Sequence, residues 1–144
     1  MTPSSSLGFA GEISAVQAWQ RLSADPKAQL LDVRTMAEWN FVGLPDLSAL
    51  GRQTHCVEWQ GFPEGGRNPG FVSEASQALS DPEAPVLVMC RSGARSRAAA
   101  IALTQAGFRQ VFNISDGFEG DRDGHGHRST QNGWKAANLP WKQG

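Results

Sequence analysis

The chain has 144 residues, 40% of them hydrophobic, which suits a single domain with one core between helices and a sheet. Its 13 basic and 14 acidic side chains give a net charge of -1, so the composition argues against nucleic acid or an anionic membrane surface as a partner. Because no apolar stretch is long enough to span a membrane and residues 1–6 lack the pattern of a secretory signal, we expect a cytoplasmic protein. We also expect a flexible segment over residues 1–10, followed by one domain over residues 11–144.

The expected elements alternate between helices and apolar strands. Ser14 forms a capping box with Gln17, which predicts the start of a helix. Thr35 forms a second capping box with Glu38, so we assign Glu38 a structural role. Such alternation is typical of an α/β fold in which helices cover both faces of a mostly parallel sheet. The other expected elements are strands at 30–33, 55–59, 85–89 and 111–114, helices at 71–79 and 96–106, and a glycine- and proline-rich loop at 61–70.

The most informative segment is Cys-Arg-Ser-Gly-Ala-Arg at residues 90–95. It lies between an apolar strand and an alanine-rich helix, which places Cys90 at the end of the strand and just before a helix N-terminus. The first amides of a helix lack intrahelical acceptors and the helix dipole is positive there, so this position stabilises an anion. Arg91, Arg95 and Arg97 add positive charge nearby. We therefore expect Cys90 to be largely thiolate at neutral pH.

Core packing is the alternative explanation for Cys90, because a cysteine after an apolar strand is often only a small buried hydrophobic residue. It does not explain why arginines and a glycine follow, since these residues contribute little to a core. A loop whose amides turn inward does explain them, with Gly93 where a side chain would obstruct or where φ is positive. The sequence thus predicts a nucleophilic cysteine.

The loop at residues 90–96, set between a strand and an Ala-rich helix, closely resembles the active loop of the rhodanese family of sulfurtransferases. The resemblance extends over residues 11–141 and implies a rhodanese-like three-layer fold. Residues 42–47 depart from it, because the histidine that many members carry in this segment is absent. The family's upstream signature is matched by Leu-Asp-Val-Arg-Thr-Met-Ala-Glu-Trp at 31–39, and its downstream signature by 107–118, 133–134 and 139–141.

The resemblance implies a reaction that passes through a persulfide on Cys90. Cys90 would attack the outer sulfur of thiosulfate or a similar small anion, and cyanide or a thiol, a protein thiol included, would then accept that sulfur. Arg95 would bind the donor's sulfonate, brace the loop, or do both. No metal or organic cofactor is required. The substrate sulfur would be bound by the loop residues Arg91, Ser92, Gly93, Ala94 and Ser96, with Arg91 at the rim.

Two other functions are compatible with parts of the sequence. Cysteine phosphatases also use a thiolate, an amide cradle and a terminal arginine, but Cys90 and Arg95 are separated by four residues, one fewer than in those enzymes. A regulatory or sulfur-carrier module that acts on a partner protein is the other alternative. The intact Cys90 and complete loop argue against a module without activity.

Asp32 and Arg34 are two apart in a strand, so their side chains point to the same face and can form an ion pair. Structural support of the active loop is the role we expect for this pair, with direct substrate contact by Arg34 as the alternative.

Three features outside the loop have less specific interpretations. We assign Cys56 to packing, the alternative being a resolving thiol within disulfide distance of Cys90. His125 and His127 lie in a glycine-rich loop without the further ligands of a zinc or calcium site, so we expect no metal there. The loop at 61–70 and the tail from Asp121 are expected to influence partner choice.

Overall fold

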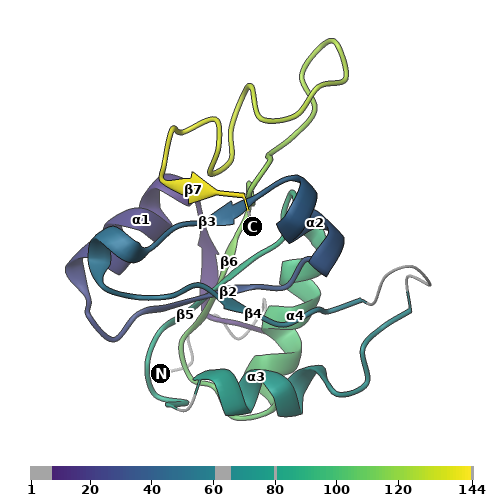
Figure 1. Cartoon of the computed structure of the whole chain (residues 1–144). Coiled ribbons are helices and arrows are strands. Elements are labelled where there is room, and N and C mark those ends of the chain that lie inside the picture. The colour runs from purple at the N-terminus through teal and green to yellow at the C-terminus, as the bar shows by residue number, and fades with distance from the viewer. Residues whose placement is uncertain (1–7, 61–65, 80, 144) are drawn as a thin grey trace.

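The computed structural model describes residues 8–60, 66–79 and 81–143. At its centre is a parallel sheet of five strands in the order β1-β6-β5-β2-β4 (Figure 1). The expected α/β fold with a parallel sheet is confirmed. These strands are β1 (Gly11–Ile13), β2 (Gln29–Asp32), β4 (His55–Cys56), β5 (Val86–Met89) and β6 (Val111–Ile114).

Helices pack on both faces of this sheet, as the alternating pattern predicts. They are α1 (Ala15–Ala24), α2 (Met36–Phe41), α3 (Phe71–Leu79) and α4 (Ala94–Gln105), with a short 3-10 helix η1 (Ser48–Leu50). Successive residues of β5 enter different cores, because side chains alternate along a strand. Val86 and Val88 pack with residues of α3 and α4, whereas Leu87 and Met89 pack with residues of α1. None of the described helices is long and apolar enough to cross a membrane.

A second, two-stranded sheet joins the middle of the chain to its C-terminal region. In it β3 (Leu44–Pro45) pairs antiparallel with β7 (Trp141–Lys142), and Figure 1 shows the two strands side by side, one in blue and one in yellow. The tail between β6 and β7 also supplies Trp134, whose fully buried side chain joins the core on the α1 side of the main sheet. The sequence pattern did not predict β1, β3 or β7.

The capping residues in the sequence predict the starts of α1 and α2 correctly. Both capping boxes are present, at Ser14 for α1 and at Thr35 for α2. Helix α4 begins at Ala94, two residues before the expected start, because Gly93 takes the N-cap position with a φ of 105°. Strand β4 is shorter than the expected strand at 55–59.

The structure describes the last three residues of the segment expected to be flexible, residues 1–10. Residues 1–7 of the segment expected to be flexible, and 61–65 of the expected loop, lie outside the described residues. Phe9 is buried in the core, and the amide of Ala10 donates to the carbonyl of Val111 at 2.8 Å. These two residues are therefore part of the folded domain.

Candidate active site

Cys90 directly follows β5, at the carboxyl edge of the parallel sheet. Its Sγ accepts a hydrogen bond from the amide of Gly93 at 3.1 Å and lies 3.3 Å from the hydroxyl of Ser96. Of the loop amides expected to turn inward, the structure brings that of Gly93 to the sulfur. A side chain at Gly93 would overlap the carbonyl of Ser115 and would also require the left-handed backbone, so the close turn of the loop needs glycine.

The Cys90 side chain is enclosed by its surroundings. It is 1% exposed and belongs to the core cluster on the α3 and α4 side of the sheet. The other expected loop residues differ in burial: Gly93 and Ser96 are buried, Ser92 and Arg95 half-buried, and Arg91 and Ala94 exposed. A donor molecule therefore reaches the sulfur only if side chains above the loop move.

A pocket of about 490 Å³ lies over this loop. Arg91 and Arg95 line it from the loop side, Glu38 from α2 and Glu119 from the tail, so its charged residues are two cations and two anions. Cys90 does not line the pocket. The rest of the wall consists of Thr35, Ala37, Val42 and Gln60.

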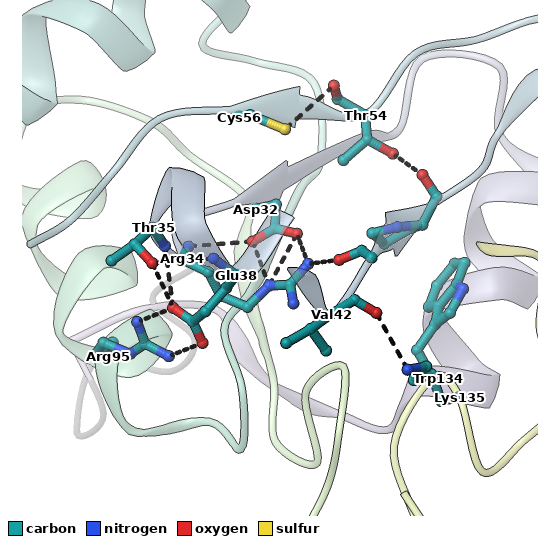
Figure 2. Close-up of polar contacts among 12 residues, drawn as sticks. Asp32, Arg34, Thr35, Glu38, Val42, Thr54, Cys56, Arg95, Trp134 and Lys135 are labelled. Carbon is teal, nitrogen blue, oxygen red and sulfur yellow. Dashed lines mark hydrogen bonds and ion pairs between the residues drawn. The ribbon is translucent and has the colours of Figure 1, made fainter. Parts of the chain in front are cut away.

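Arg95 and Glu38 form a two-point ion pair across this pocket (Figure 2). The two guanidinium Nη atoms donate to the two carboxylate oxygens at 2.7 and 2.9 Å. Burial opposes ionisation of Glu38, but hydrogen bonds from Arg95 and from the amide of Thr35, with the charge of Arg95, outweigh it and lower the pKa of Glu38 to about 2. The same hydrogen bond raises the pKa of Arg95. Of the two roles that the sequence left open for Arg95, this geometry is that of a brace.

Acidic partners also offset the positive field that three arginines were expected to create. Arg97 donates from Nε to Glu12 at 2.9 Å, and Arg95 is paired with Glu38. Arg91 is exposed, where water screens its charge. The expectation of a strongly positive loop is thus too simple, because β1 and α2 each bring a carboxylate to it.

Asp32 and Arg34 form the expected ion pair, and both side chains are fully buried. Arg34 donates to the Asp32 carboxylate from Nε at 2.9 Å and from Nη2 at 2.7 Å, and Nη2 also donates to the carbonyl of Gly43 at 2.7 Å (Figure 2). Its guanidinium lies over the ring of Phe118, 4.3 Å from the centroid. The amide of Phe118 in turn donates to the Cys90 carbonyl at 2.9 Å. The pair therefore links the end of β2 to the segments around the loop.

Asn113 is a polar residue of the site that the sequence analysis missed. It lies in β6 with a fully buried side chain, and its Oδ1 accepts a short hydrogen bond from the hydroxyl of Ser96. Its Nδ2 donates to Glu12 at 2.8 Å and to the carbonyl of Gly93 at 3.2 Å. A polar residue inside an apolar strand, Val-Phe-Asn-Ile, is the signal that could have drawn attention to it.

Cys56 is exposed, so its assignment to packing is wrong. It pairs with Asp32 in the sheet, and Asp32 pairs with Met89, so two strand spacings of about 4.8 Å separate Cys56 from β5. That separation is too large for a disulfide with Cys90. Desolvation by neighbouring groups and then the charge of Asp32 raise the pKa of the Cys56 thiol to about 12, although part of the residue faces solvent.

The histidine loop is organised by its own acidic residue. Asp123 accepts hydrogen bonds from the amides of His125 and His127, both at 2.9 Å, and from the hydroxyl of Thr130 at 2.7 Å. Within the part of the chain that the structure describes, no cluster of three or more potential metal ligands occurs.

Comparison with known proteins places this fold and loop in a family. Residues 10–144 match the family model described as the STR4 middle domain. The crystal structure of Rv0390 from M. tuberculosis is 47% identical and superposes with a TM-score of 0.86, over 94% of this chain and 99% of that one. A homodimeric polysulfide-sulfur transferase from Wolinella succinogenes shares the fold at 21% identity and a TM-score of 0.62, over 95% of this chain and 80% of that one.

Two proteins, one uncharacterized and one named, are similar to this chain in sequence. An uncharacterized protein of Rickettsia rickettsii, described as an RP600 homolog, is 35% identical over 131 residues, which are 90% of this chain and 95% of the relative. Rhodanese-like domain-containing protein 4, chloroplastic, of Arabidopsis thaliana is 32% identical over 132 residues, which are 91% of this chain but 25% of the relative. Because the family model covers almost the whole chain and the named relative is a rhodanese-like protein, this protein belongs to the rhodanese-like family.

Proposed function

We propose that this protein transfers a sulfane sulfur through a persulfide on Cys90. The observation that carries the proposal is the position of Sγ, at the end of β5, within hydrogen-bonding distance of the Gly93 amide and the Ser96 hydroxyl. Each hydrogen bond to a charged acceptor contributes about 1.5–3 kcal/mol, and here both would stabilise a sulfur anion just before α4. Such donors favour a thiolate nucleophile and a sulfur-centred leaving group.

The reaction has two half-reactions that share one covalent intermediate. The Cys90 thiolate attacks the outer sulfur of a donor such as thiosulfate, the S–S bond of the donor breaks, and sulfite leaves with the electron pair. The outer sulfur remains on Cys90 as a persulfide anion. Cyanide or a thiolate then attacks this outer sulfur, and Cys90 leaves as a thiolate. No proton or external electron is needed in either step.

Arg95 would hold a donor through its two outer nitrogens once it separates from Glu38. The carboxylate of Glu38 now accepts from one hydrogen on each of these nitrogens, the end-on contact that a sulfonate would also make. The pair lines the pocket over the loop that carries the buried Cys90. Arg91, exposed at the rim, would attract the donor anion.

Intact-mass spectrometry tests the proposal directly. After incubation with thiosulfate and removal of excess donor, we expect the wild-type chain to gain one sulfur atom and Cys90→Ser to gain none. Cys56→Ser is the matched control, because it removes the other cysteine, and it should gain the sulfur as the wild type does. Absence of the added sulfur with thiosulfate and also with a small organic persulfide would refute the proposal.

A second candidate is a regulatory or carrier module that acts on a partner protein. The observation that favours it is the 1% exposure of Cys90, since a buried thiol reacts slowly with free small molecules. A purely regulatory module would show no thiocyanate formation from thiosulfate and cyanide at any donor concentration, whereas a carrier that is loaded on Cys90 would still form thiocyanate.

A further inference from the structure

The hydroxyl of Ser96 has one hydrogen to donate and three acceptors within reach. The Cys90 sulfur lies 3.3 Å away and the carbonyl of Gly93 3.2 Å away, while Oδ1 of Asn113 is closer than either. All four residues are buried, so water does not replace any of these hydrogen bonds. The three acceptors therefore compete for the single hydroxyl hydrogen of Ser96.

The carboxamide of Asn113 is held in one orientation by its other contacts. Its Nδ2 donates to a carboxylate oxygen of Glu12 at 2.8 Å and to the carbonyl of Gly93 at 3.2 Å. If the amide were turned over, Oδ1 would face these two acceptors and both hydrogen bonds would be lost. Glu12 is itself held by Arg97 at 2.9 Å. Oδ1 of Asn113 is thus a preset acceptor that faces Ser96.

The charged groups on the elements around Cys90 are largely compensated in pairs. They are Asp32 with Arg34 at the end of β2, Glu38 of α2 with Arg95 of α4, and Glu12 of β1 with Arg97 of α4. In the segment after β6, Asp116 accepts from the amides of Ala15 and Gly133, and Glu119 lines the pocket with the exposed Arg91. Helix α3 contributes apolar contacts. The nearest groups that stabilise a negative charge on Sγ are therefore two dipoles, the Gly93 amide and the Ser96 hydroxyl.

We infer that Asn113 is a positioning residue that competes with the Cys90 sulfur for the hydroxyl hydrogen of Ser96. The inference rests on the proposed persulfide cycle. When Sγ carries the negative charge, the hydrogen turns to the sulfur, and Oδ1 of Asn113 loses its partner. When the sulfane sulfur is attached, the charge moves to the outer atom, Sγ becomes a neutral bridging sulfur, and the hydrogen returns to Asn113. Asn113 therefore favours the persulfide form over the free thiolate.

Two substitutions at this position should act in opposite directions. Asn113→Leu keeps a similar volume but removes the nearest acceptor, so the sulfur competes for the Ser96 hydrogen only with the Gly93 carbonyl, and the thiolate is stabilised. Asn113→Asp combined with Glu12→Gln exchanges amide and carboxylate. The exchange keeps a hydrogen bond between positions 12 and 113 and makes the acceptor facing Ser96 stronger, while the Gly93 carbonyl loses its donor. A residue that only filled space would not shift ionisation of the sulfur in opposite directions in these two variants.

The test is the pH dependence of Cys90 alkylation by iodoacetamide, measured in a Cys56→Ser background so that one thiol reacts. We expect Asn113→Leu to move the midpoint of the rate profile to lower pH by about 0.5 to 1, the equivalent of one neutral hydrogen bond. The exchange variant, Asn113→Asp with Glu12→Gln, should move it to higher pH. In a Ser96→Ala background, Asn113→Leu should have no effect on the midpoint.

Equal shifts of the midpoint with and without Ser96, or shifts of the same sign in the two Asn113 variants, would overturn the inference. If Asn113→Leu does not fold, the exchange variant alone tests it through the part of its shift that is lost in the Ser96→Ala background, because the charge of the new carboxylate acts on the sulfur with or without the hydroxyl. Alkylation needs no turnover, so a failure here is distinct from a failure of the persulfide mechanism, which the mass measurement reports. If the persulfide forms, its loss to cyanide should be faster in Asn113→Leu than in the wild type.

Discussion

Replacement of Glu38 by glutamine separates the structural role of this residue from its effect on Arg95. Glutamine serves in a capping box as glutamate does, so the side-chain oxygen can still accept from the amide of Thr35, a hydrogen bond of 3.0 Å in the wild type. The same oxygen, Oε1, also accepts from Nη1 of Arg95, and that hydrogen bond can remain. The amino group that replaces Oε2 cannot accept from Nη2, and the attraction between two full charges is lost. Glu38→Gln should therefore leave α2 in place, loosen the hold on the guanidinium and free Nη2 for a sulfonate.

The expected gain follows from the geometry of the ion pair. Two hydrogen bonds of 2.7 and 2.9 Å join side chains that are 22% and 19% exposed. Pairs that remain partly solvated contribute about 1 kcal/mol, and slightly more where the geometry has two contacts, because water screens them. A donor that competes for Arg95 is spared most of this cost in the variant, because one of the two hydrogen bonds and the charge attraction are lost. We expect kcat/KM for thiosulfate to rise about two- to fivefold.

The assay is thiocyanate formation from thiosulfate and cyanide, with a small alkyl persulfide that lacks a sulfonate as the second donor. Glu83→Gln is the matched control, because it removes the same charge from an exposed ion pair with Arg109 near the opposite end of β5. We expect an increase for thiosulfate alone and only in Glu38→Gln. An equal change for both donors, or a decrease for thiosulfate, would refute the reasoning.

Two further predictions concern stability. Gly93→Ala would force a side chain into the Ser115 carbonyl at a φ of 105°. We therefore expect the free energy of unfolding, measured in urea, to fall by about 2–4 kcal/mol, and the mass of the added persulfide sulfur to be lost. Unchanged values would contradict the role of the turn. Because the pKa of Glu38 is lowered from 4.5 to about 2, its ionised form stabilises the fold above pH 4.5, and this contribution is lost as the pH falls through 2. The difference in Tm between wild type and Glu38→Gln should therefore shrink between pH 7 and pH 2.5, and a constant difference would count against the ion pair.

Features that depend on near neighbours in the chain could be predicted from the sequence. The two capping boxes join residues three apart, and the Asp32–Arg34 pair joins residues two apart at the end of β2. The position of Cys90 between a strand and a helix is equally local. In each case residues close together in the chain determine the feature.

Contacts between distant parts of the chain could not be predicted in the same way. Glu38 and Arg95 are 57 residues apart, and Asn113 meets Glu12 at a separation of 101. These contacts depend on the order of the strands, in which β5 lies beside β2 and β6 lies beside β1, and a single sequence does not reveal that order. Cys56 was misplaced for a related reason, because β4 is an edge strand and therefore leaves part of its surface uncovered.

The pairing of β3 with β7 makes the surroundings of the buried Arg34 a joint product of two segments nearly a hundred residues apart. A side chain at Gly43 would overlap the ring of Trp141, and Lys135 both donates to the carbonyl of Val42 at 3.1 Å and lies over that ring. Gly43 in turn accepts from Arg34. Chimeras between relatives should consequently preserve this packing when both segments are transplanted together, and lose it when either is transplanted alone.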